Sequence, residues 1–577
     1  MVNYLINRLL YSLQIWFFRA NFKPVFRIKF SRNFLHKSPA RRMTFSRVFG
    51  LLSRTAKLIF WWKWQKLKKF FLSLRLDMCA YMHICVRIML EKLAKQTAIY
   101  GISTILGRML SYLLTPFYTR IFGVESYGII TDVYALIPFA LVVLTMGMES
   151  SYFRFAAKAE SEGGNIEQSK RKLFATTWGI TSLAALLFFA VVFIFRNEAS
   201  ALMGEVYAAN PLYVVTVAAI VMMDVAACIP FARLREQGKA LTFVSLKLFN
   251  IVLQVGLAVA FWAVGLFDSE FGVGWAFVAN LVASTITLVA VVAASGRISL
   301  RIDWALLLLI FGYSLPLLLS GIAGTANEFI DRQLIKYLVP AGSLAQLGIY
   351  GAITKIAVVM TLFTQMYRLA AEPFFLANYR KEEFKAMNAA ALKYFVMVSM
   401  FIFLGIALYR DVFALIVGRN FREGIHILPV VLGANVLSGV WLNLSFWYKR
   451  EEKTKFALWI TLTGLVASVG FGVWLIPTLG IYGAAWSRFA AEAVMVAVSI
   501  VLNRLYYPTP YQFGRMVEYI VLALAIFFVA EWIEMPNELL QYTLSTAFIV
   551  LYLCYAVWRE KIDLRAMFNH ILRRGKR

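Results

Sequence analysis

About fourteen long apolar stretches follow one another along this chain, separated by short charged connections. A helix that crosses the hydrocarbon core of a membrane needs about 20 consecutive apolar residues. Because 61% of the residues are hydrophobic and 16% are charged, the chain has more apolar surface than a water-soluble fold can bury. The sequence therefore predicts an all-α integral membrane protein. The predicted spans are 96–120, 126–149, 172–195, 208–229, 240–265, 273–295, 304–331, 344–366, 387–409, 424–447, 456–476, 480–503, 514–532 and 538–558.

The charges of the connections indicate the orientation of these spans. From residue 94 onward, every second connection is rich in Lys and Arg, as in 154–172 and 449–455. Most of the connections between them are poor in these residues or acidic, as in 267–270 and 531–534, and 410–424 is an exception. Basic connections tend to stay in the cytoplasm. We therefore expect an even number of spans, with both ends of the spanning part cytoplasmic.

Residues 1–88 differ from the rest of the chain. They contain 18 Lys and Arg and one acid, Asp77, and so carry +17 of the net charge of +28. A helix lying on anionic lipid is one interpretation of this basic, aromatic segment. An RNA-binding arm is another, although no folded RNA-binding module surrounds it. We expect translation to begin at Met89, which would leave residues 1–88 outside the native fold.

The spanning part contains a weak internal repeat. Three segments have counterparts about 210–220 residues further on: 127–131 matches 347–351, 235–239 matches 450–454, and 274–276 matches 483–485. Each copy would hold six helices, and an even number gives both copies the same orientation, as in a parallel repeat. The sequence predicts two six-helix lobes, 89–303 and 304–505, followed in 506–577 by two extra helices and a basic cytoplasmic tail.

Residues 115–128 read Thr-Pro-Phe-Tyr-Thr-Arg-Ile-Phe-Gly-Val-Glu-Ser-Tyr-Gly. This segment resembles the turn between helices 1 and 2 of bacterial polysaccharide (O-antigen type) flippases, which belong to the multidrug/oligosaccharidyl-lipid/polysaccharide exporter superfamily. Similar stretches occur at 331–332, 348–356 and 371–375, so the resemblance covers about residues 89–560.

The resemblance implies fourteen helices in two six-helix lobes. It also implies a transporter of lipopolysaccharide O-antigen or exopolysaccharide biosynthesis in the bacterial cytoplasmic (inner) membrane. Its partners would be membrane lipid and a polyprenyl-pyrophosphate-linked oligosaccharide, which it would move from the cytoplasmic to the outer leaflet by alternating access.

Such a cargo requires a wet cavity with cations, because its pyrophosphate and hydroxyl groups cannot cross hydrocarbon unaided. Charged side chains inside spans are costly and are by default functional. We predict that Arg108, Lys247, Lys355 and Arg488 bind substrate. Arg108 could instead pair with a buried acid, and Lys247 could reach the cytoplasmic interface through its long side chain.

Four acids are candidates for coupling to a cation, either a proton or sodium: Asp132, Glu328, Asp331 and Glu492. Glu492 lies one helical turn after Arg488 and shares its face. The two could form an ion pair that only fixes helix packing. Alternatively, Glu492 could be a protonatable switch, with cargo phosphate competing for Arg488.

Other classes of protein fit the sequence less well. There is no phosphate-binding glycine loop and no nucleophile arrangement, and Cys79, His83 and Cys85 do not have a zinc-site spacing. We therefore predict no catalytic residues, metal, cofactor or nucleic-acid partner, and no enzyme. A multidrug exporter of the same superfamily would favour an acid-dominated cavity. A peptidoglycan-precursor flippase has such similar cargo chemistry that charge counting does not separate the two.

Overall fold

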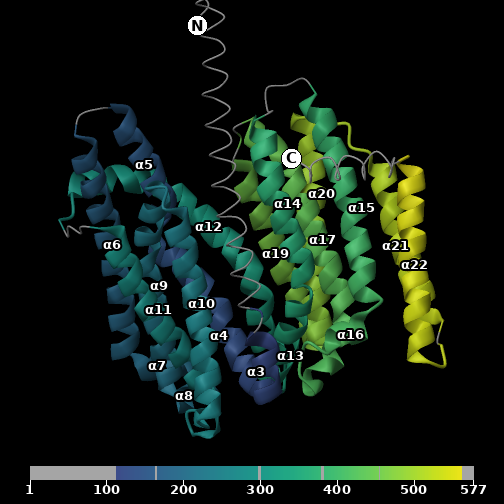
Figure 1. Ribbon diagram of the computed structural model, residues 1–577, viewed down its shortest axis with the longest axis horizontal. Coiled ribbons are helices and arrows are strands. Elements are labelled where there is room, and N and C mark those ends of the chain that lie inside the picture. Colours follow the sequence, from purple (N-terminus) through teal and green to yellow (C-terminus); the bar gives the residue numbers. More distant parts are fainter. Residues whose placement is uncertain are drawn as a thin grey trace, which may run out of the picture. The chain divides into compact units, whose positions relative to one another are not determined.

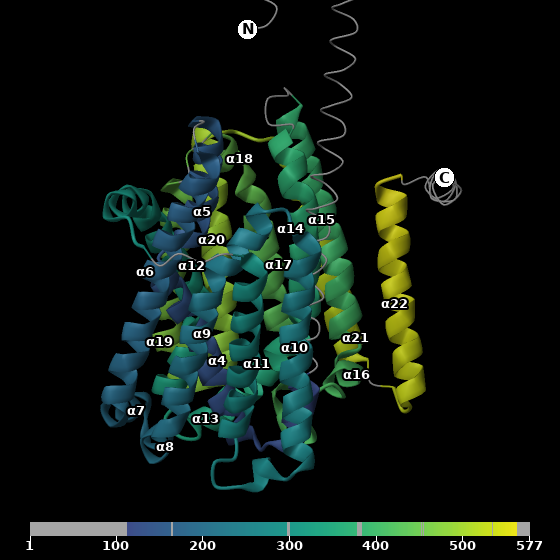
Figure 2. The same ribbon diagram turned by 60° about the vertical axis from the view of Figure 1, so that its left-hand side comes forward.

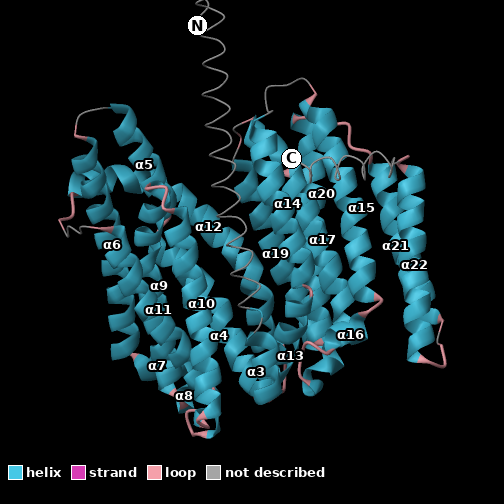
Figure 3. Ribbon diagram, viewed as in Figure 1, coloured by secondary structure: helices cyan, strands magenta, loops and turns pink. Residues whose placement is uncertain are grey.

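The computed structural model describes residues 112, 114–162, 165–296, 301–377, 383–451, 453, 455–533 and 535–561. These residues belong to the compact unit Leu93–Arg577. The extension 1–88 and most of the predicted span 96–120, including Arg108, lie outside the described residues. All regular secondary structure in the described part is helical (Figure 3).

The helices follow the predicted spans closely. The first elements are α3 (Leu114–Ile121), α4 (Val124–Thr145), α5 (Met148–Glu162), α6 (Ile166–Ile194), α7 (Arg196–Met203), α8 (Glu205–Ala209), α9 (Pro211–Glu236), α10 (Ala240–Ala263), η3 (Leu266–Asp268) and α11 (Gly274–Ser295). The next are α12 (Trp304–Leu338), α13 (Ser343–Ile356), α14 (Val358–Ala377), α15 (Phe384–Ala407), α16 (Arg410–Ala414), η4 (Arg419–Ile427), α17 (Leu428–Leu444), α18 (Phe446–Arg450), α19 (Lys455–Leu479), α20 (Ile481–Tyr506), α21 (Phe513–Trp532) and α22 (Glu538–Arg559).

Twelve helices of the described part are long and apolar enough to cross a membrane. The pair α13 and α14, bent by 48°, would be a thirteenth span. The predicted all-α membrane fold of about fourteen helices is confirmed. Three helices continue well past the predicted ends of their spans: α9 to Glu236 rather than 229, α12 to Leu338 rather than 331, and α14 to Ala377 rather than 366. The added residues of α12 include Gln333 and Lys336, which both contact Asp132 of α4.

The helices of the described part pack in two groups (Figure 1). In the first group, α3–α11, helix α9 packs extensively against α6 and α11; in the second, α13–α20, the closest pairs are α19 with α20 and α17 with α20. Helices α21 and α22 pack on α15.

Helix α12 belongs to both groups. Its beginning buries Leu307 and Ile310 in an apolar cluster with Tyr152 and Phe174 of the first group. Its second half packs along α19 and α20, where Leu334 lies against a glycine of α19. The division of the chain into lobes at 303 and 304 therefore stays a prediction.

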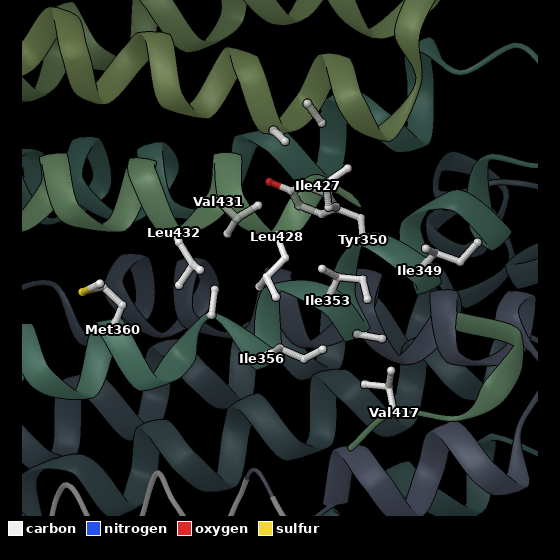
Figure 4. Close-up of a cluster of buried hydrophobic side chains, with 14 of the residues drawn as sticks. Ile349, Tyr350, Ile353, Ile356, Met360, Val417, Ile427, Leu428, Val431 and Leu432 are labelled. Carbon is white, nitrogen blue, oxygen red and sulfur yellow. The ribbon is translucent and has the colours of Figure 1, made fainter. Parts of the chain in front are cut away.

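Helix α13 is anchored in the second group by an apolar core (Figure 4). Ile353 and Ile356 lie in one buried cluster with Leu428 and Leu432 of α17. These side chains are completely or almost completely buried, and inside a membrane their close van der Waals packing, rather than removal from water, holds the helices together. The packing fixes one face of α13 and leaves another face for the first group.

Helices α21 and α22 are held to α15 by polar contacts at their ends. Lys393 of α15 and the hydroxyl of Tyr519 both bind Glu560, which follows α22. Burial alone would raise the pKa of Glu560, but these two donors outweigh burial and hold its pKa below the usual range. The Tyr552 hydroxyl also donates to the carbonyl of Met397 (2.9 Å).

The connections of the described helices gather at two ends, which both views show (Figures 1 and 2). One end, called the basic end, carries the links after α5, α9, α14 and α18. The opposite end carries α3, α7, α8 and α16 and the link between α12 and α13.

Candidate functional site

The two helix groups meet most extensively where α4 contacts α13, near the opposite end. This contact, called the glycine seam, brings backbone against backbone. A Cβ atom on Gly128 would lie 1.9 Å from the carbonyl oxygen of Leu344, and one on Gly348 would lie 2.1 Å from that of Val124. Only glycine fits at such a separation, so the two helices touch without intervening side chains.

The glycine seam is reciprocal. Gly128 and Gly348 are 220 positions apart in the sequence, and so are their contacts Val124 and Leu344. Each copy therefore presents the same pair of positions to the other, as in a contact around a two-fold axis. Gly128 and Gly348 lie in the repeated segments 127–131 and 347–351, and Val124 and Leu344 lie three residues before those segments.

A third reciprocal contact lies one turn further along the same helices. A Cβ on Gly351 would lie 2.4 Å from Oγ1 of Thr131. These residues are also 220 positions apart, so the approximate axis passes close to this contact. The repeat that the sequence predicts is thus visible where its two copies face each other.

The segment 115–128, on which the family resemblance rests, adds contacts beside the glycine seam. Thr119 accepts a hydrogen bond from the backbone N–H of Gly418 (3.0 Å), and Arg120 donates to a backbone carbonyl just after α16 (2.8 Å). The ring of Tyr127 meets that of Phe421 edge to face, with centroids 5.4 Å apart. This segment therefore joins the first group to the second at the opposite end.

Asp132 is completely buried and connects the groups by polar contacts. It accepts hydrogen bonds from the Tyr207 hydroxyl (2.6 Å) and from Nε2 of Gln333 (2.8 Å), and it forms an ion pair with Lys336. Tyr207 belongs to the first group, whereas Gln333 and Lys336 lie on α12. Burial and the charge of Asp132 raise the pKa of Tyr207, which keeps its hydroxyl a donor.

Asp331 is the centre of a second buried polar cluster, within the second group. The Tyr350 hydroxyl donates to Oδ2 of Asp331 (2.7 Å), and Nη1 of Arg488 lies 3.2 Å from the same oxygen. The predicted substrate-binding residue Arg488 and the predicted coupling residue Asp331 are therefore direct partners. They connect α12 to α13 and α20.

Glu492 shares a helix face with Arg488, but Arg488 forms its ion pair with Asp331 instead. The charges of Arg488 and Glu492 still act on each other, so their interpretation as a self-neutralising ion pair stays a prediction. Glu492 is 9% exposed, and its Oε2 has no hydrogen-bond partner in the described part of the chain. Glu328, by contrast, is exposed.

Lys355 lies at the end of α13, directly before the bend into α14. It shares the helix face of Gly348 and Gly351, at spacings of seven and four, and so projects toward the first group. Its side chain is exposed, and Nζ lies 5.1 Å from the centre of the Tyr112 ring. Lys355 is therefore a cation inside a span, on the face of α13 that contacts the first group.

Arg332 stands beside Lys355 on the neighbouring helix α12. It lies one turn before Lys336, on the stripe of α12 that faces α4. Nη1 of Arg332 donates to the carbonyl of Glu328 (3.0 Å), and the positive charge of Arg332 acts on Lys355. Arg332 and Lys355 are thus two neighbouring cations inside spans, and the charge of Arg332 also acts on Tyr127 of the first helix group.

Lys247, a further predicted substrate-binding residue, lies apart from this site. Its Nζ is 4.2 Å from the centre of the Phe231 ring in the first group, and its charge acts on Asp224 of α9. Asp224 was not among the predicted coupling residues, although it is an acid inside a predicted span. The structure does not bring Lys247 together with Lys355 or Arg488.

The comparisons with known proteins come from a family model and from solved structures, since no curated protein matches the sequence. Residues 93–378 match the family model "Polysaccharide biosynthesis protein". The fold is similar to that of "Lipid II flippase MurJ, inward closed conformation", with a TM-score of 0.66 at 13% identity over 81% of this chain and 100% of that chain. Residues 93–378 make up about half of the chain, which belongs to this polysaccharide biosynthesis protein family.

Two multidrug transporters also share the fold with the chain. One is described as an inward-facing multidrug resistance MATE family transporter (TM-score 0.58, 16% identity, 74% of this chain and 95% of that chain). Another is the MATE multidrug transporter DinF-BH (TM-score 0.51, 16% identity, 72% of this chain and 95% of that chain). The multi-pass membrane transporter predicted from the sequence is thereby confirmed, while its cargo stays a prediction.

Proposed function

We propose that the protein moves a polyprenyl-pyrophosphate-linked oligosaccharide from the cytoplasmic to the outer leaflet of the bacterial cytoplasmic membrane. The observation that carries this proposal is the pair Lys355 and Arg332, two cations inside neighbouring spans that contact the other helix group. Cations at this depth suit a diphosphate, which a hydrocarbon environment would otherwise exclude. The match to a polysaccharide biosynthesis family supports an oligosaccharide as the remainder of the cargo.

The orientation follows from the charges of the connections. Because basic connections stay in the cytoplasm, the basic end is the cytoplasmic end and both termini of the spanning part are cytoplasmic. The opposite end is then the outer end. Among the described helices, the extensive contacts between the groups are made by α12 and α13 with α3–α6, and the glycine seam closes the outer side. This conformation would therefore receive cargo from the cytoplasmic side.

The cargo's entry would change the balance of charge in the second group. A diphosphate beside Arg332 and Lys355 would also attract Arg488, which Asp331 holds in the present conformation. Glu492, buried and with one oxygen that lacks a partner among the described residues, is our candidate for the proton- or sodium-binding residue, with Glu328 and Asp331 in its vicinity. Release of Arg488 to the cargo would couple the cation to transport, and Lys247 would contact the distal sugars.

A binding experiment with purified protein tests the cargo assignment. Undecaprenyl pyrophosphate should raise the unfolding temperature of the wild type in detergent, whereas undecaprenol should not. Each charge-assisted contact to the diphosphate contributes about 1.5–3 kcal/mol, so Lys355→Ala and Arg332→Ala should each weaken binding roughly ten- to hundredfold. Arg368→Ala is the matched control, since Arg368 is paired with Glu372 on the same span (3.3 Å).

Two results would contradict the proposal. One is undiminished stabilisation of the Lys355→Ala/Arg332→Ala double variant by undecaprenyl pyrophosphate. The other is stabilisation by a lipophilic cation such as ethidium with none by the diphosphate lipid, which would favour a multidrug exporter instead. Surface glycan restored by the wild type, but not by the double variant, in a strain that lacks the gene would extend the result to transport.

A further inference from the structure

The outer contact between the helix groups has two physically different parts. The glycine seam is apolar and reciprocal, since each copy supplies the same positions. The contacts of Asp132 are polar and occur on one side only. The position 220 residues after Asp132 is Ala352, and the position 220 residues before Lys336 is Pro116. The internal repeat therefore accounts for the seam but not for the ion pair.

The ion pair bridges the two parts that must separate if the outer side opens. Lys336 is 7% exposed and Asp132 is completely buried, and in the closed state each is the other's charged partner. A buried ion pair adds little net stability, because the cost of removing both charges from water offsets their attraction. Loss of one partner, however, leaves the other charge buried and uncompensated. Such a pair therefore strongly favours the one arrangement in which both partners meet. Moving both charges together into water nevertheless costs little free energy.

The side chains around the ion pair of Asp132 and Lys336 would allow it to separate and to form again. Tyr207 donates to Asp132 from the same helix group, so it would keep the carboxylate in position when Lys336 leaves. Lys336 also lies 4.7 Å from the centre of the Tyr207 ring, which adds a cation–π contact in the closed state. Gln333, one turn before Lys336, would depart together with it because both are on α12.

We propose that Asp132, Gln333 and Lys336 form the latch of an outer gate whose faces are the glycine seam. The proposal builds on the alternating-access function above. When the outer side opens, Lys336 and Gln333 leave Asp132, both charges become hydrated, and the reciprocal glycine contacts part. In this role Asp132 pairs with protein groups from across the gate rather than with a coupling ion.

A labelling experiment in spheroplasts tests the latch. Thr131 lies in the seam opposite Gly351, so Thr131→Cys, in a variant without the four native cysteines, reports on opening. A membrane-impermeant maleimide added outside should label this cysteine slowly. Lys336→Met should raise the labelling rate about tenfold or more, because uncompensated Asp132 favours the hydrated, open state. The double variant Asp132→Asn/Lys336→Gln removes both charges and retains hydrogen-bonding groups. Its labelling rate should therefore return most of the way to the slow rate of the parent.

A second variant and a control keep the test independent of folding. Gly348→Ala should also raise the labelling rate while the latch stays intact, since its Cβ would displace Val124. Glu149→Gln removes an ion pair with Arg235 at the basic end and should leave the rate unchanged. Parent-like labelling of both Lys336→Met and Gly348→Ala, in protein present in the membrane at normal amount, would overturn the gate.

The readout requires no cargo, so its failure is distinct from failure of the flippase assignment. Faster labelling of Lys336→Met together with no binding of undecaprenyl pyrophosphate would support the latch and contradict the proposed cargo. Normal binding of the lipid, with no change in the labelling rate of the variants, would contradict the latch alone.

Discussion

Asp132 and Asp331 are both buried, both accept a hydrogen bond from a tyrosine and both pair with a cation, but their partners lie in different places. Tyr350 and Arg488 join Asp331 to helices of its own group. Asp132 instead reaches across to Lys336 on α12. The first arrangement can remain intact when the groups move apart, whereas the second cannot. Similar chemistry thus supports a fixed structure in one place and a separable contact in the other.

The largest effect should follow from breaking the fixed cluster. Asp331→Ala leaves Arg488, whose side chain is 25% exposed, without its carboxylate partner. Loss of one member of a buried pair costs about 3–5 kcal/mol, and the partial exposure of Arg488 places the expected loss at the lower end of that range. Thermal unfolding in detergent, followed by tryptophan fluorescence, would measure it.

The same measurement on Asp132→Ala sharpens the comparison. We expect a smaller loss, about 1–3 kcal/mol, because the helix groups can separate at the outer end and allow water to reach Lys336. Equal losses for Asp132→Ala and Asp331→Ala would show that the cross-group contact is as rigid as the internal one.

A pair of glycines offers a comparison without charge. A Cβ on Gly483 would lie 2.3 Å from the carbonyl oxygen of Leu475, inside the α19–α20 hairpin. Gly483→Ala should therefore cost about 1–3 kcal/mol through overpacking. Gly348→Ala has a similar clash across the seam and should cost less, since the groups can shift. A larger melting shift for Gly348→Ala than for Gly483→Ala would contradict this.

The smallest effect should come from an exposed ion pair. Glu167 and Arg171 are one turn apart on α6, with side chains 77% and 48% exposed. Pairs of this kind contribute about 0.3–0.5 kcal/mol. Glu167→Gln should leave both the unfolding temperature and the outer labelling rate within error, which sets the background for the variants above.

Much of the fold could be predicted from local sequence. Span positions follow from apolar length alone, so most predicted boundaries lie within a few residues of the helices. The end of α12 was predicted too early, because Gln333 and Lys336 are polar residues typical of a loop. Their contact with Asp132 cannot be predicted from the local sequence. Asp224 also has a local signal, as an acid inside a predicted span, yet it was not selected as a coupling residue.

Less of the candidate site than of the fold could be predicted from the local sequence. Lys355 and Arg488 were identified from their depth in the spans, but their surroundings were not. Arg488 was expected beside Glu492, one turn away on the same helix, whereas the structure pairs it with Asp331 on another helix. Short-range helix geometry says which residues share a face, but not which neighbouring helix offers the better partner.

The amino-acid sequence alone was sufficient for the membrane class, the span positions and the repeat of 127–131 in 347–351, because hydrophobic length and helical period are local properties. Only the packed structure revealed that the two repeated segments face each other across the glycine seam, and that Asp132 meets Lys336. Those contacts join residues from distant parts of the chain, and their partners are selected by the packing of whole helices, which no local pattern encodes.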